Sequence, residues 1–192
     1  VCSSDLKESG VTIMQMGEGL DTGDMLSKIV IPLDKEETGG SLFGKLAQAG
    51  AELLIKTLPS IEQGTVTPEK QPQESPTPYA AMITKQMGLM DFSKPAAELE
   101  RLVRGLNPWP SAYTFVNGKT LKVWKSVLGQ ETSDAEPGTV MGTDAQGIHV
   151  ACKDGVLILT EVQLEGKKRM EAEVFLRGYH MESGTRFTDH KE

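Results

Sequence analysis

The chain has 192 residues, of which 38% are hydrophobic, and its formal net charge is −7 at pH 7. This length accommodates one large domain or two small ones, and the hydrophobic content is sufficient for a buried core. No apolar run approaches the roughly 20 residues that a membrane helix needs. The two cysteines lie far apart in sequence, so nothing indicates a disulfide framework or a C-x-x-C metal site. Residues 1–10 lack the basic start and apolar stretch of a secretory signal, so we expect a soluble cytoplasmic protein.

The charge is spread over the whole chain. Residues 1–104 carry 10 basic and 15 acidic side chains, and residues 105–192 carry 10 and 12. Neither half is basic overall, which disfavours a protein that binds nucleic acid with most of its surface. Any RNA-binding site must therefore be a local patch.

Two strands are predicted at residues 11–16 and 25–31, where apolar and β-branched residues predominate. Between them lies the loop that contains GLDTGDM, residues 19–25, in which Asp21 and Asp24 flank a Thr-Gly step. Gly and Asp are common turn formers. The residues alone therefore fit a plain hairpin turn as well as a functional loop.

A helix is predicted to follow, and either Thr38 or Ser41 can cap its start. Pro59 is expected to end or kink it. Apolar residues at steps of three and four define one face of this helix, namely Phe43, Ala47, Ala51, Leu54, Leu58 and Ile61. Two strands and one helix bury too little apolar surface to form a stable domain alone, so residues 1–64 are expected to be the last part of a larger domain.

Residues 65–80, TVTPEKQPQESPTPYA, contain four prolines in a polar run. Such a segment favours an extended chain over a helix or a central strand. We therefore assign residues 65–84 to an inter-domain linker and residues 85–192 to a second domain.

The second domain is predicted to open with a helix that Ser93 caps and in whose first turn Pro95 lies. Its apolar stripe consists of Leu99, Leu102, Val103 and Leu106, and Gly105 and Pro108 end it. Asn117-Gly118 between two strand-like runs is a strong hairpin signal. Three more short strands with tight turns suggest a small antiparallel barrel, and a short helix is expected at about residues 171–178.

Three segments carry a resemblance to a known family: GVTIMQMGEGLDTGDML, NPWPSAYTFVNGKTLKVWK, and PGTV followed by GIHVACKDGVLILTEVQLEGKK. Together, and in this order from about Ser9 to Phe187, they resemble methionyl-tRNA formyltransferases. LDTGD alone is shared by the wider group that uses formyltetrahydrofolate, whereas NPWP followed by the NGK hairpin narrows the resemblance to the tRNA enzymes. The implied fold is α/β plus β: the C-terminal part of a Rossmann-like formyltransferase domain, and then an OB-like β-barrel.

The resemblance implies transfer of a formyl group from 10-formyltetrahydrofolate to the amino group of methionine on initiator tRNA, a step of translation initiation and one-carbon metabolism. No metal is implied. The family's catalytic group is an Asn, a His and an Asp, and the Asp corresponds to Asp21. The folate-binding loop would comprise Gly19, Leu20, Thr22, Gly23 and Asp24. For Asp24, capping the loop and contacting the ligand both remain open.

The family's catalytic Asn and His lie upstream of this loop, where the present sequence has only 18 residues and no matching pair. Its histidines, His149, His180 and His190, all lie in the second half. We therefore expect an N-terminally truncated chain, unable to transfer formyl groups by itself. The first six residues do not resemble the family.

The expected partner is initiator methionyl-tRNA, with no membrane contact and a monomeric chain. Six cations near the second-domain hairpin and in a later turn are candidates for tRNA phosphates: Lys119, Lys122, Lys125, Lys167, Lys168 and Arg169. Charge alone favours a solvated edge that discourages strand pairing, and the resemblance favours the RNA-binding interpretation. Trp109 and Trp124 could stack on bases, but core or hinge positions are the favoured interpretation.

Two other functions remain open. The chain could be a non-catalytic OB-like RNA-binding module, or a formyltransferase acting on a sugar or a purine precursor. The hairpin and NPWP disfavour the sugar and purine alternatives. His149 is expected to be structural, and Cys152 to be a small buried apolar residue.

Overall fold

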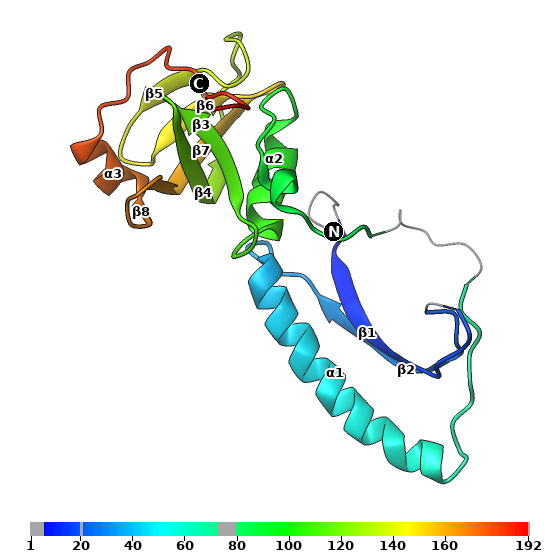
Figure 1. Ribbon diagram of the computed structural model, residues 1–192. Coiled ribbons are helices and arrows are strands. Elements are labelled where there is room, and N and C mark those ends of the chain that lie inside the picture. Colours follow the sequence, from blue (N-terminus) through cyan, green and yellow to red (C-terminus); the bar gives the residue numbers. More distant parts are fainter. Residues whose placement is uncertain (1–5, 20, 73–79, 192) are drawn as a thin grey trace. The chain divides into compact units, whose positions relative to one another are not determined.

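The computed structural model describes residues 6–19, 21–72 and 80–191. These residues form two compact units, one built mainly from residues up to 81 and the other mainly from the residues after it (Figure 1). Leu20 of the predicted folate loop and the centre of the predicted linker, residues 73–79, lie outside the described residues.

The smaller unit contains the predicted hairpin. Strands β1 (Glu8–Met14) and β2 (Met25–Pro32) pair antiparallel, with Glu8 opposite Pro32 and Met14 opposite Met25. Both predicted strands are thus confirmed. The first begins earlier in the chain than expected, which leaves residues 15–24 to form the loop.

Helix α1 (Gly39–Glu62) runs alongside this hairpin (Figure 1). The hydroxyl groups of Thr57 and Ser27 are hydrogen-bonded at 2.7 Å, which joins the helix to β2. Pro59 does not end the helix, which continues to Glu62. The proline lies close to the C-terminal end, so its missing N–H disturbs little of the helix. The predicted apolar face is real but exposed: Phe43, for example, is 76% accessible.

The larger unit is a six-stranded antiparallel sheet with helices packed against it (Figure 1). Its elements are the 3₁₀ helix η1 (Lys85–Gly88), α2 (Ala96–Gly105), β3 (Ala112–Val116), β4 (Lys119–Leu128), β5 (Val140–Thr143), β6 (Ile148–Ala151), β7 (Val156–Leu164), β8 (Met170–Glu171) and α3 (Ala172–Gly178). The sheet order is β3-β4-β7-β6-β5, and β8 pairs with β7. Asn117 and Gly118 both adopt positive φ, at 48° and 69°, which confirms the predicted tight hairpin.

The strands of the larger unit do not close into the barrel predicted from the sequence. Among the described residues, edge strands β3 and β5 are not paired with each other. Both sides instead reach the same C-terminal segment: Phe115 of β3 bridges Thr188, and Thr139, just before β5, bridges Arg186. The C-terminal segment therefore lies between the two edge strands, and the order of paired strands stays open.

Helix α2 covers one side of the sheet with the predicted apolar stripe. Leu99 and Val103 are fully buried in a core shared with β3, β4, β6 and β7. The predicted capping residue is wrong. Ser93 donates its hydroxyl to Asp91 instead, at 2.6 Å, and Asp154 from the β6–β7 turn accepts the N–H of Ala96 at 2.9 Å.

No helix in the described part of the chain combines the length and apolar character needed to cross a membrane.

Candidate functional site

The β1–β2 loop is held in place by its own backbone and by one distant side chain. The N–H of Gln15 donates to the carbonyl of Asp24 at 2.9 Å. The side-chain amide of Gln71 donates to the carbonyls of Asp21 (2.9 Å) and Gly23 (3.0 Å). Gln71 comes from the segment predicted to be a free linker, and no sequence pattern indicated this role.

The loop glycines have local reasons to be glycine. A Cβ atom at Gly23 would lie 1.5 Å from the carbonyl oxygen of Gln15, and a Cβ at Gly19 would lie 2.9 Å from the hydroxyl of Thr22. Substitution at Gly23 would therefore break the loop. Close packing inside the loop, and not only approach of a ligand, explains these glycines.

Asp21 is exposed and adopts a left-handed backbone conformation, with φ of 51°. A purely turn-forming Asp commonly accepts hydrogen bonds from the backbone N–H groups that follow it. Asp144 does so, accepting from Gln146 at 2.8 Å. Within the described residues, no such bond is recorded for the carboxylate of Asp21, whose main chain is held while its acid group faces outward. Asp24 is half-buried, and its carboxylate likewise has no hydrogen bond to a described residue.

The second candidate site lies on β4, β7 and the approach to β8. The β4–β7 register shifts at Trp124, so Val123 pairs with Val162 and Lys125 pairs with Glu161. Such a bulge interrupts the alternation of side chains along a strand. Lys122 and Lys125, which strict alternation would place on opposite faces, both remain accessible on either side of Trp124.

Trp124 and Glu161 bring three of the six predicted cations together. The guanidinium carbon of Arg169 lies 4.5 Å from the centroid of the Trp124 ring, and the Lys122 ammonium lies 5.7 Å from it. Both distances fit cation–π contacts. Arg169 donates two hydrogen bonds to Glu161, and Lys125 forms an ion pair with the same carboxylate at 3.3 Å. Hydrogen bonding from Arg169 holds the pKa of Glu161 below its ordinary value.

The other three predicted cations are not part of this cluster. Lys119 starts β4 beside the Asn117-Gly118 turn, and Lys167 and Lys168 lie in the turn after β7. All three are exposed, and no side-chain contact among the described residues joins them to Trp124 or Glu161. Like the three cations of the cluster, they lie on β4 or in the segment between β7 and β8.

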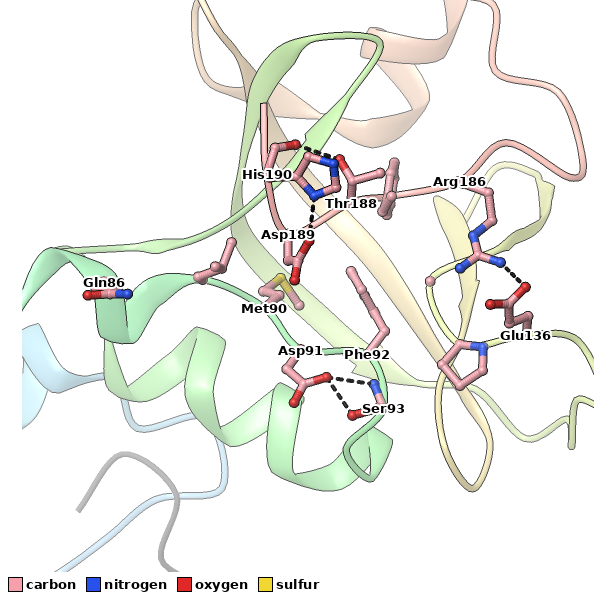
Figure 2. A pocket seen from close by; sticks show the side chains of 14 residues that line it. Gln86, Met90, Asp91, Phe92, Ser93, Glu136, Arg186, Thr188, Asp189 and His190 are labelled. Atoms are coloured by element: carbon pink, nitrogen blue, oxygen red, sulfur yellow. Dashed lines mark hydrogen bonds and ion pairs between the residues drawn. The ribbon is translucent and has the colours of Figure 1, made fainter. Parts of the chain in front are cut away.

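A pocket of about 680 Å³ lies elsewhere in the larger unit, where the C-terminal segment passes η1 and the start of β5 (Figure 2). Its charged groups are already engaged: Arg186 pairs with Glu136, His190 with Asp189, and Asp91 with Ser93 (Figure 2). Phe92 and Phe187 also line the pocket, and both are buried. Charged groups that already neutralise one another make this pocket a weaker candidate than the loop of Asp21 and the cluster around Trp124.

The described residues contain no cluster of three or more His, Cys, Asp or Glu side chains that could hold a metal ion. Cys152 is 2% accessible, and burial raises the pKa of its thiol to about 12, as suits the predicted apolar role. His149 lies on β6, with Nε2 3.0 Å from Asp144. Trp109 is 58% exposed, so of the two positions predicted for it, core or hinge, the core position is wrong.

Two family models match the chain. Residues 82–180 match the C-terminal domain of formyl transferases, and residues 4–58 match the formyl transferase domain. The two matched regions correspond closely to the two structural units.

Curated relatives give a consistent comparison over most of the chain. A methionyl-tRNA formyltransferase of Lachnospira eligens is 51% identical over 181 residues, which cover 92% of this chain and 57% of that protein. The methionyl-tRNA formyltransferase of Bacillus subtilis is 46% identical over 179 residues, covering 93% of this chain and 56% of that protein. The chain thus spans somewhat more than half the length of these relatives.

Solved structures share the fold at lower identity. The sugar 3N-formyl transferase WlaRD, crystallised with dTDP and 5-N-formyl-THF, gives a TM-score of 0.64 at 20% identity, over 87% of this chain and 58% of that one. HypX from Aquifex aeolicus in complex with tetrahydrofolic acid gives 0.62 at 18% identity, over 88% of this chain and 30% of that one. These two comparisons establish a common mixed α/β architecture.

Proposed function

The chain belongs to the formyl transferase family, and on this premise we propose that it serves to transfer a formyl group from 10-formyltetrahydrofolate to methionine on initiator tRNA. One observation carries the proposal: the chain is 51% identical to a methionyl-tRNA formyltransferase across 92% of its residues. That match includes the β1–β2 loop and the larger unit alike. The sugar enzyme shares the fold at only 20% identity.

Asp21 is the proposed catalytic carboxylate. As the methionine amine attacks the formyl carbon it must lose a proton, and negative charge develops on the formyl oxygen. A carboxylate that orients a histidine and stabilises its charged form assists both events. The acid group of Asp21 is exposed and has no hydrogen-bond partner among the described residues, and its main chain is held by Gln71; this arrangement suits that role.

The loop residues Gly19, Thr22, Gly23 and Asp24 are the proposed wall of the folate site, together with Leu20. Gly23 and Gly19 keep this loop thin, because a side chain at either position would collide with the loop itself. A loop with few side chains, whose backbone is held by Gln71, lets a flat ring approach that backbone closely. The formyl donor supplies the one-carbon group, and the chain supplies the surface and the carboxylate.

The larger unit is the proposed tRNA-binding part, with an OB-like arrangement completed by the C-terminal segment at Arg186 and Thr188. Lys122, Lys125 and Arg169 form the centre of its RNA surface. Lys119, Lys167 and Lys168 extend that surface along the backbone of the tRNA. Phosphate contacts of this kind supply affinity without sequence readout. We propose a cytoplasmic monomer.

A chimera tests the activity. The 179 matched residues of the Bacillus subtilis relative are replaced by this chain, and formyl transfer from 10-formyltetrahydrofolate is measured with methionyl initiator tRNA and with a dTDP-linked amino sugar as acceptors. We expect turnover on the tRNA on the order of 1 per second or faster, and none on the sugar. A folded chimera that formylates the sugar but not the tRNA would overturn the proposal.

A further inference from the structure

Glu161 is an acidic side chain at the centre of the cationic cluster, and the proposed function gives it no role. Its side chain is only 11% exposed, although carboxylates are rarely buried unless they are paired. Its two oxygens accept hydrogen bonds from Nε and Nη2 of Arg169, the second at 2.8 Å. The ammonium nitrogen of Lys125 lies 3.3 Å from the same carboxylate. Two cations of the RNA surface are therefore tied to one carboxylate.

Trp124, on whose ring Arg169 rests, is itself fixed at two points. The indole Nε1 donates to the side chain of Gln163 at 3.2 Å, and the Trp124 carbonyl accepts from the side chain of Asn107 at 2.9 Å. Gln163 in turn donates to the carbonyl of Lys167 at 3.1 Å. The bulge at Trp124 leaves its carbonyl outside the regular ladder, and Asn107 of the NPWP motif satisfies it.

The orientation of Arg169 is therefore set from two sides. A guanidinium group has five N–H donors in a rigid fork. Glu161 takes the Nε and Nη2 edge, and the Trp124 ring covers one face. In the described part of the chain, no partner is recorded for Nη1. The contacts with Glu161 and Trp124 restrict the direction of that edge, and the Arg169 side chain is 39% exposed.

Glu161 also lowers the attraction of the cluster for any polyanion. Two of the three cations of the cluster, Arg169 and Lys125, contact this carboxylate, which is ionised at neutral pH because its pKa lies below the ordinary value of a glutamate. Flexible single strands can gather around loose cations in many ways, and their binding depends mainly on total charge. A rigid RNA gains instead from a donor already held in the required direction, because less conformational entropy is lost on binding.

We propose that Glu161 is a selectivity residue of the RNA-binding surface: by holding Arg169 against Trp124, it favours a phosphate of a rigidly folded RNA over flexible single-stranded RNA. This inference rests on the proposed tRNA-binding role of the larger unit. Glu161 acts through Arg169 and is thus a positioning residue, as is Asn107 for Trp124.

The test compares Glu161→Gln with a matched control in the full chain. Glu171 on β8 is exposed and acts on Arg169 through its charge, without a recorded hydrogen bond to it. Glu171→Gln therefore removes the same charge from the same neighbourhood but leaves the fork intact. Affinities for initiator tRNA and for polyuridylate are measured for wild type and for both variants, with circular dichroism to confirm folding.

We expect Glu161→Gln to tighten polyuridylate binding roughly threefold to fivefold without tightening tRNA binding, so that the ratio of the two affinities falls. Glu171→Gln should change both affinities alike and leave the ratio unchanged. In an Arg169→Ala background, Glu161→Gln should no longer change the ratio, because coupled residues lose their separate effects.

A spectroscopic readout needs no RNA. In a Trp109→Phe background, Trp124 is the remaining tryptophan, and its emission should change with Glu161→Gln but not with Glu171→Gln. If wild type binds tRNA but both variants alter the ratio equally, the inference on Glu161 is wrong and the proposed function stands. If wild type binds neither RNA at low salt, the proposed tRNA role fails and the inference falls with it.

Discussion

At the scale of single residues, the difference between Asp21 and the other turn acids is one of hydrogen bonding. Asp91 and Asp144 each accept a hydrogen bond from the backbone two residues ahead, at 3.0 Å and 2.8 Å. Such bonds are what make Asp a common turn residue. Asp21 keeps its turn through its left-handed backbone and through Gln71 instead. Among the described residues its carboxylate accepts no such bond, so we do not expect it to shape the loop.

Replacing Asp21 by Asn in the active chimera should lower kcat by at least roughly 100-fold, with little change in the unfolding midpoint. The amide keeps the size of the side chain but removes the charge that would support an imidazolium. Steady-state kinetics and thermal unfolding measure the two effects, and Asp24→Asn serves as the neighbouring control. Wild-type turnover in the Asp21→Asn variant would show that Asp21 only shapes the turn.

The 192-residue chain by itself is expected to show no formyl transfer. The unit that carries Asp21 contains no histidine, because His149, His180 and His190 all belong to the larger unit. Asp21 then has no histidine of its own unit to orient. Incubation of the purified chain with 10-formyltetrahydrofolate and methionyl initiator tRNA measures this, and turnover on the order of 1 per second would contradict it.

At the scale of elements, helix α2 begins at a capping residue that is remote in sequence. Its N-cap position is Pro95, which has no side-chain donor or acceptor. Asp154 accepts from Ala96 in its place, and its carboxylate lies where the partial positive charge of the helix is greatest. This contact therefore caps the N-terminus of α2 and also connects the helix to the β6–β7 turn.

Asp154→Ala should destabilise the larger unit by about 1 kcal/mol, a fall in the unfolding midpoint of roughly 4–8 °C. Ser93→Ala should have a smaller effect, since that hydroxyl bonds only to Asp91. Thermal unfolding of both variants by circular dichroism separates the two possibilities. The opposite order of effects would restore Ser93 as the cap.

The C-terminal segment is tied to β4 by an acid-sensitive contact. Glu165 accepts from the N–H of Thr120 and from Lys191, both at 3.0 Å, and these contacts lower its pKa from the ordinary 4.5 to about 2. Because the folded-state pKa is depressed, the stabilisation is complete above pH 4.5 and is lost as the pH falls towards 2. The unfolding midpoint of Glu165→Gln should therefore lie below that of wild type at pH 7 and converge with it near pH 2. A difference that does not vary with pH would exclude this contact.

Sequence patterns predicted the helices, strands and turns well, but they predicted the contacts between distant segments less well. Local signals sufficed for the β1–β2 hairpin, the Asn117-Gly118 turn and the stripe of α2, because turn chemistry and apolar spacing act over a few residues. The cap from Asp154 and the loop contact from Gln71 join residues that are distant in sequence. The bulge at Trp124 breaks the alternation on which strand predictions rely, so the grouping of Lys122 and Lys125 around it could not be foreseen.

At the scale of the whole molecule, the buried core is concentrated in one unit. The cluster of buried apolar residues lies entirely within the larger unit, whereas α1 of the smaller unit buries only Leu42 and Thr57 among its described residues. Its apolar face leaves Phe43 and Leu58 more than half exposed. Buried apolar area supplies most of the stability of a fold, so the two units should differ strongly in resistance to unfolding.

Limited proteolysis should therefore remove the smaller unit first, with cleavage in the proline-rich segment 65–84. A fragment that begins near residue 85 should remain, and it should keep the thermal transition of the intact chain. Mass spectrometry of a time course identifies the cleavage sites. A first cut within residues 110–165 would contradict the division into two units.

Because the net charge of the chain is −7, the proposed RNA surface is a local cationic patch, and the salt dependence of binding measures its size. Each phosphate neutralised contributes about 0.7 to 0.9 to the slope of log affinity against log salt, so partial use of six cations predicts roughly −2 to −4 for tRNA. Replacing Lys122 and Lys125 together by Ala should make that slope shallower by about one to two. Lys35 and Lys56 of the smaller unit are exposed and provide the control, because their replacement by Ala changes the net charge equally. If the control pair flattens the slope as much as the first pair, net charge rather than this surface governs tRNA binding.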